Sequence, residues 1–145
     1  MAASSPDQIV EDALRLLVAG LRRRDIDGVL ALFHSDAVLF GSEDGEQAIG
    51  AEQLRAFLTR LFDRPHTYGW SGWDPVITGG SGGTVWFVAP STVVVKDDAG
   101  GEASAAYRLS GVLEQDTAER WLFRLFNGSE PARALDDTAP RDHGD

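Results

Sequence analysis

The hydrophobic period of this sequence changes once, and that change limits the folds the chain can adopt. In the N-terminal part, up to about residue 63, apolar residues recur every three or four positions, as they do in amphipathic helices. From residue 67 to residue 127, β-branched and aromatic residues are instead grouped in short runs separated by Gly, Asp and Ser. Helices followed by strands predict an α+β domain whose helices pack on one face of a sheet.

Three helices are expected in the first part. The first covers residues 7–24, with Ser5 and Pro6 supplying its cap and first turn. The second covers residues 25–34, and the third covers residues 51–63 between Gly50 and Pro65. The second helix is expected to bury Val29, Leu30 and Phe33.

Strands are expected in the second part and once before it. The patterns favour strands at 37–40, 67–78, 84–95, 101–114 and 120–127, with a Gly-rich loop at 41–50. Segments 79–83 and 96–101 are typical of hairpin connections, which favours an antiparallel meander. We expect one domain over residues 1–131, followed by a mobile acidic tail over 132–145.

Composition excludes several classes of function. The 145 residues include no Cys and only three His without a metal-binding spacing, so neither a metal site nor another cofactor is expected. The formal charge of −10 opposes binding to nucleic acid or to an anionic membrane. With no signal-like segment and no apolar run of about 20 residues, we expect a cytoplasmic protein.

Several segments together resemble a known family. They are residues 25–27 and 32–38, Gly50, and the end Trp-Leu-Phe-Arg-Leu-Phe-Asn-Gly-Ser-Glu-Pro at 121–131. In this order and spacing, the chain resembles the SnoaL-like, ketosteroid-isomerase-like branch of the nuclear transport factor 2-like superfamily over residues 7–131. The resemblance implies a cone-shaped barrel, in which the three helices pack on a curved antiparallel or mixed sheet. Relatives include steroid isomerases, polyketide cyclases, dehydratases, epoxide hydrolases and non-catalytic modules.

The resemblance also implies a pocket for a small apolar molecule inside the cone. The positions expected to line it are Leu17, Phe33, Phe57, Trp70, Trp86, Arg108 and Phe126. Mostly apolar walls with a few polar groups suit a flat hydrophobic guest. The alternative is that the same aromatic side chains fill the cone as an ordinary core. Only the volume of the cavity separates these alternatives.

The steroid isomerases of this family place a base, a phenol and a protonated acid around their substrate. The corresponding positions here are Gly41, Leu17 and a position near Leu109 or Ser110, none of which ionises usefully. Isomerisation by that mechanism is therefore not expected. Asn127 stands where many relatives carry His, and an amide can orient a carbonyl group but cannot shuttle a proton.

Arg108 is the other catalytic candidate. Strand alternation places it on the face opposite Tyr107. On a concave face its guanidinium would polarise an oxygen, whereas on a convex face it would be a solvated charge, and a slip of one residue reverses the outcome. Glu43, Asp44 and Glu46, in a loop expected near the cavity mouth, are further acidic candidates, and the alternative is an exposed acidic loop.

Two functions follow from this interpretation. The first is a cofactor-free cyclase, isomerase or dehydratase for a hydrophobic metabolite, in which Arg108 and Asn127 polarise an oxygen and the base is unidentified. The second is a non-catalytic ligand-binding or structural module. In either case we expect a homodimer, because the resembling family pairs through its sheet and the strands here are rich in Trp and Val.

Overall fold

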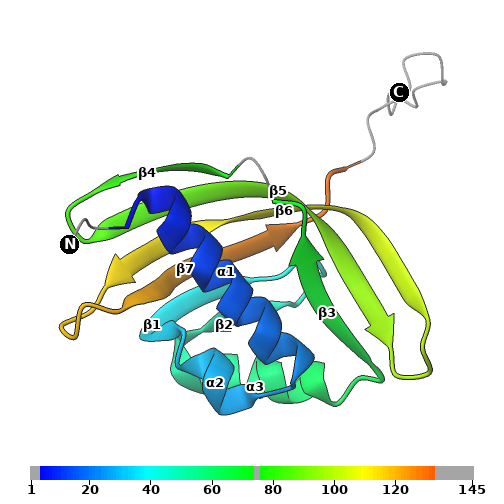
Figure 1. The fold of residues 1–145 in the computed structure, drawn as a ribbon. Helices are drawn as coiled ribbons and strands as arrows, with labels where there is room; N and C mark the ends of the chain where they lie inside the picture. Colours follow the sequence, from blue (N-terminus) through cyan, green and yellow to red (C-terminus); the bar gives the residue numbers. More distant parts are fainter. Residues whose placement is uncertain (1–3, 74–75, 133–145) are drawn as a thin grey trace, which may run out of the picture.

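The computed structural model describes residues 4–73 and 76–132, which form three helices and one strongly curved, mixed sheet (Figure 1). The helices are α1 (Pro6–Arg22), α2 (Ile26–Leu30) and α3 (Gly50–Phe62). Figure 1 shows α1 crossing the concave side of the sheet, with α2 and α3 beside β1 and β2. The α+β class and the half-barrel shape expected from the sequence are confirmed.

Seven strands make up this sheet. They are β1 (Phe33–Phe40), β2 (Gln47–Ile49), β3 (His66–Ser71), β4 (Ile77–Ser81), β5 (Thr84–Asp97), β6 (Glu102–Gln115) and β7 (Trp121–Ser129). Their order is β2-β1-β7-β6-β5-β3, and β4 also pairs with β5. Only the pairing of β1 with β7 is parallel, which makes the sheet mixed.

The first helix forms as its sequence predicts. The side chain of Ser5 accepts a hydrogen bond from the amide of Gln8, and Pro6 occupies the first turn. One stripe of the helix is buried against the sheet and the cavity: Ile9, Val10, Ala13, Leu14, Leu17, Val18, Gly20 and Leu21. In the described part of the chain, no helix is long and apolar enough to cross a membrane.

The expected second helix was too long. Asp25 caps α2 by accepting a hydrogen bond from the amide of Gly28, and the helix ends at Leu30. Phe33 is buried, as expected, but it starts β1 rather than ending a helix, because it pairs with Phe123 on β7. The expected strand 37–40 is the second half of β1. The start of β1 was assigned to the helix because Phe33 fits both the helical and the strand pattern of apolar residues.

Two other boundaries also differ from the sequence-based expectation. The expected loop 41–50 contains β2, which pairs with β1, and the expected strand 67–78 is two strands, β3 and β4. Gly72 has a φ of +67° just after β3, a conformation that most residues avoid. Both β3 and β4 pair with the long strand β5, β3 with residues 92–97 and β4 with residues 84–88.

The register of β5, β6 and β7 decides which side chains face the helices. Buried side chains alternate along β5 and β6, at odd positions that include Phe87, Ala89, Tyr107 and Leu109. On β7, a register shift opposite Val112 and Leu113 breaks this alternation. Phe123 and Phe126, three residues apart, are consequently both buried.

The domain boundary at 131 is not tested, and most of the expected tail lies outside the described residues.

Candidate ligand-binding cavity

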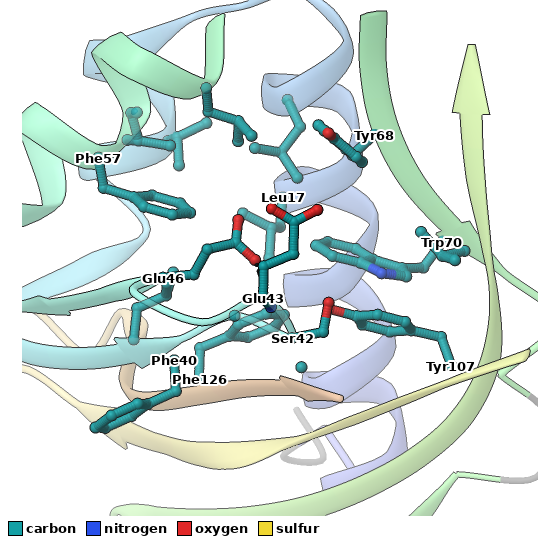
Figure 2. Close-up of a pocket in the computed structure, with 18 of the residues that line it drawn as sticks. Leu17, Phe40, Ser42, Glu43, Glu46, Phe57, Tyr68, Trp70, Tyr107 and Phe126 are labelled. Atoms are coloured by element: carbon teal, nitrogen blue, oxygen red, sulfur yellow. Dashed lines mark hydrogen bonds between the residues drawn. The ribbon is translucent and has the colours of Figure 1, made fainter. Parts of the chain in front are cut away.

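A cavity of about 280 Å³ lies between the helices and the concave face of the sheet. Figure 2 shows the side chains that surround it. Helices contribute Leu17, Leu21, Val29, Phe57, Leu58 and Leu61; strands contribute Phe33, Leu39, Phe40, Tyr68, Trp70, Val93, Val95, Tyr107, Phe126 and Gly128; connecting or terminal segments contribute Gly41, Ser42, Glu43, Glu46 and Glu130. The volume lies just below the range of about 300–1,000 Å³ that is usual for small-molecule sites.

Aromatic rings make one wall of the cavity. The ring of Trp70 is stacked with that of Tyr107 at a centroid distance of 6.1 Å and is tilted against Phe126 at 5.6 Å. Phe126 in turn makes an edge contact with Phe33 at 6.4 Å. Because these rings hold one another in place, the wall offers flat faces to a flat guest.

Polar groups gather where the cavity opens, a region that we call the mouth: Ser42, Glu43, Glu46, Tyr68, Tyr107 and Glu130. Ser42, Glu43 and Glu130 are exposed, whereas Tyr107 is buried deeper. Figure 2 shows the carboxylates of Glu43 and Glu46 directed toward the space between Phe57 and Trp70. An apolar interior with polar groups on one side is the usual arrangement of a site that orients its ligand.

The side chain of Glu46 is fixed by the loop that carries it. Its Oε1 accepts a hydrogen bond of 2.8 Å from the amide of Glu43, and its backbone carbonyl accepts one of 2.8 Å from the amide of Gly41. A Cβ atom at Gly41 would stand 2.7 Å from this Oε1. The carboxylate of Glu46 therefore occupies the space that any side chain at position 41 would need.

Tyr107 places a phenol against the cavity. Burial raises the pKa of this phenol, hydrogen bonding with Ser42 opposes the rise, and the negative charges of Glu46 and Glu130 add to it. A Cβ atom at Gly128 would stand 2.5 Å from the Tyr107 hydroxyl, so only glycine leaves room for it. The phenol is thus a neutral hydrogen-bond donor at ordinary pH.

A second phenol, Tyr68, belongs to a small polar cluster. Arg64 Nη1 donates to the Tyr68 hydroxyl at 3.0 Å, and His66 Nε2 lies 2.7 Å from the same oxygen. The hydrogen bond with Tyr68 raises the pKa of Arg64, which stays a cation. Because the guanidinium can only donate, the proton of Tyr68 is available to His66 or to a ligand.

Trp70 lines the cavity, but its indole nitrogen is not exposed there. The Nε1 atom is buried and has no hydrogen-bond partner within the described part of the chain. An atom that faced the open cavity would have accessible surface, so Trp70 contributes apolar ring surface to the wall rather than a donor for a ligand.

Of the apolar residues expected to line the pocket, all but Trp86 do so. Leu17, Phe33, Phe57, Trp70 and Phe126 lie on the cavity wall. Trp86 does not, because the even positions of β5 face outward, and its side chain is 45% exposed. Its ring instead covers Gly79, where a Cβ atom would stand 2.4 Å from it.

The two residues expected to be catalytic both lie outside the cavity lining. Arg108 is exposed on the face of β6 opposite Tyr107. Asn127 Nδ2 donates to Ser110 Oγ at 3.4 Å, on the same outer face. Their catalytic roles remain a prediction without a geometric basis. The alternation of Tyr107, Leu109 and Leu113 along β6 was a signal that Arg108 faces outward.

Tyr68, Tyr107 and Glu130 line the cavity but were not predicted from the sequence to do so. Gly41 and Leu17, which stand at positions where the resembling isomerases carry ionisable groups, also line it. Among residues 4–73 and 76–132, no group of three or more His, Asp and Glu side chains is arranged to hold a metal ion. The polar side chains of the lining are those of Ser42, Tyr68, Tyr107 and the three glutamates.

Comparison with known proteins agrees with this architecture. The sequence matches the SnoaL-like domain family over residues 10–132, and the chain belongs to that family. A search of curated proteins found no match.

Solved structures with low sequence identity share the fold. One is a nuclear transport factor 2-like superfamily protein from Salmonella enterica serovar Typhimurium, with a TM-score of 0.77, 14% identity, and coverage of 96% of this chain and 100% of that one. A ketosteroid isomerase-like protein from Erwinia carotovora atroseptica has a TM-score of 0.67 and 19% identity, covering 90% and 100% of the two chains. ActVI-ORFA from Streptomyces coelicolor has a TM-score of 0.69 and 16% identity, covering 84% and 94%.

Proposed function

We propose that this protein binds a small molecule with a largely apolar body inside the cone. The observation that carries the proposal is the cavity of about 280 Å³, which is open although aromatic and aliphatic side chains line it. A core that simply filled the cone would leave few voids larger than a water molecule. The phenol of Tyr107, which lines the cavity, supplies a donor for an oxygen of the guest.

The same groups support acid and base chemistry without a cofactor. A carboxylate at Glu46 can accept a proton from a carbon next to a carbonyl group, while the neutral phenol of Tyr107 donates a hydrogen bond to the carbonyl oxygen. Such a pair suits an isomerase, a cyclase or a dehydratase. The ketosteroid isomerase-like neighbour shares this fold, and the likeness alone does not assign its reaction to this chain.

The alternative is binding without turnover. It is favoured by the lining, which includes no histidine among the residues that the structure describes, and by the outward position of both Arg108 and Asn127. Proton exchange distinguishes the two functions. An enzyme of the proposed kind would catalyse deuterium exchange at the acidic carbon of a bound ketone, and Glu46→Gln would abolish that exchange.

The binding itself is tested with a matched pair of variants on β5. Val95 lines the cavity, whereas Val94 faces the other side of the strand. We expect Val95→Phe to fill the cavity and to weaken binding of 2-naphthylmethanol by about tenfold or more, the usual effect of a size mismatch in an apolar pocket. Val94→Phe should leave the affinity unchanged.

Quenching of tryptophan fluorescence and isothermal calorimetry measure this affinity. The proposal is contradicted if neither a two-ring alcohol nor a library of similar size binds the wild-type protein. It is also contradicted if both variants bind as well as the wild type, because the ligand then lies elsewhere.

A further inference from the structure

The charge of the cavity lining is all of one sign. Among residues 4–73 and 76–132, the charged side chains of the lining are the carboxylic acids Glu43, Glu46 and Glu130, with no Arg, Lys or His. A ligand in the cavity therefore shares it with three carboxylates. The sign of the potential at a concave, partly desolvated site strongly biases which ligands bind.

One described cation, Arg64, lies close to two of these carboxylates. Besides its hydrogen bond with Tyr68, the charges of Glu43 and Glu46 raise its pKa. Arg64 approaches Glu43 at 4.0 Å and donates to Tyr68, so it belongs to the rim of the cavity rather than to its lining. Arg60 and Arg64 line a neighbouring depression of about 150 Å³, together with Glu43, Asp44 and Glu46. Glu46 is fixed over Gly41 by the loop, and Glu130 stands just after β7. Neither of these two carboxylates forms an ion pair within the described residues.

The pKa of the buried Tyr107 phenol responds to the negative charges of the cavity. The charges of both Glu46 and Glu130 raise the pKa of the Tyr107 phenol, although these residues belong to different segments. Both carboxylates line the same cavity as Tyr107, Glu46 from the segment before β2 and Glu130 from the segment after β7. Trp70 and Tyr107, stacked at 6.1 Å, present aromatic faces to this cavity, and such faces also attract cations.

We propose that the preferred ligand of this cavity is a hydrophobic amine that is protonated at neutral pH, with one or two rings as its body. The inference rests on the proposed function and names the ligand class of that same site. The rings lie against the aromatic and aliphatic walls, and the ammonium group faces Glu46 and Glu130. A carboxylate on the same body is excluded, because it would be desolvated next to like charges.

The test compares three ligands with one body: 2-naphthylmethylamine, 2-naphthylmethanol and 2-naphthoate. Binding to the full chain is measured by calorimetry at neutral pH. We expect the amine to bind about tenfold more tightly than the alcohol, a difference of about 1.4 kcal/mol, and the naphthoate to bind most weakly. The preference for the amine should shrink when salt rises from about 0.02 M to about 0.5 M.

Variants locate the charge that is responsible. Glu46→Gln and Glu130→Gln keep the shape of the side chains, and each should reduce the ratio of amine affinity to alcohol affinity severalfold. Glu102→Gln is the control, because Glu102 is exposed at the start of β6 and does not line the cavity.

The outcomes distinguish the two proposals. If the alcohol binds as tightly as the amine, or if the preference survives in both cavity variants, the inference is overturned and the proposed function stands. If none of the three ligands binds, the proposed function fails and the inference fails with it.

Discussion

At the scale of single residues, two glycines make room for polar groups of the site. The carboxylate of Glu46 occupies the space where a side chain at Gly41 would lie, and the hydroxyl of Tyr107 does so at Gly128. Neither glycine has a positive φ, so what each position requires is the absence of a side chain rather than an unusual backbone. The positions of the Glu46 carboxylate and the Tyr107 hydroxyl therefore require glycine at 41 and 128.

The Tyr107 phenol predicts a pH dependence of stability. Burial raises the pKa of this group above its ordinary value, so the folded state holds the proton more tightly than the unfolded state does. This contribution is fully present below the ordinary phenol pKa of about 10 and is lost as the pH rises through the higher folded value. We expect the free energy of unfolding, measured with urea, to fall between about pH 9 and pH 11.

Tyr107→Phe is the matched control for this prediction, since it keeps the ring and removes the ionising group. Its free energy of unfolding should fall less steeply over the same pH range. Equal slopes for the two proteins would show that Tyr107 does not cause the dependence.

At the scale of elements, α1 both closes the cavity and anchors the helical layer. Leu17 and Leu21 line the cavity, while Leu14 is fully buried in the core and Leu16 is 57% exposed. The 3.6-residue period alone separates these roles. The helix packs along β3, where Gly69 lets Val18 and Arg22 approach the strand closely.

Two leucines on α1 therefore differ in their effect on stability. Leu14→Ala should lower the free energy of unfolding by about 2–5 kcal/mol, because it leaves a void in a packed core. Leu16→Ala should change it by no more than about 0.5 kcal/mol. Urea denaturation followed by tryptophan fluorescence measures both values, and similar losses for the two variants would contradict the orientation of α1.

At the scale of the whole molecule, the outer face of the sheet carries a broad apolar surface. Its exposed members are Phe40, Ile77, Trp86 and Val88, of which Phe40, at the end of β1, also borders the cavity. Register places them in one area: Ile77 is opposite Val88 on β5, and Phe40 is linked to it through Asn127 and Ser110. Large exposed apolar surfaces commonly mark interaction sites.

This surface leads to the prediction on assembly. The homodimer expected from the sequence would bury the outer face of the sheet against the same face of a second copy. We expect a dimeric mass by light scattering at micromolar concentration, and a monomeric mass for Val88→Asp. Leu16→Asp, an exposed change on α1, is the control and should stay dimeric. A monomeric wild-type protein would contradict the prediction.

The sequence by itself determined the α+β class, the succession of helices followed by strands, most of the helix bounds and the family, but not β2 or the division between β3 and β4. Hydrophobic periods, caps and glycines are local signals, so they were visible in α1, α3 and the long strands. Five of the six apolar residues that the sequence assigned to the pocket lie on the cavity wall, since the family resemblance carried over at those positions.

Only the tertiary structure decided which polar groups share the site. Trp86 and Arg108 are one residue away from inward positions, and a strand reverses the face of its side chains at every step. Glu46, Tyr68, Tyr107 and Glu130 meet because non-local strand pairing closes the cone around them. Alternation along one strand indicates which of its residues share a face, but register and curvature depend on contacts between distant segments, and these contacts decide which polar groups from different strands meet.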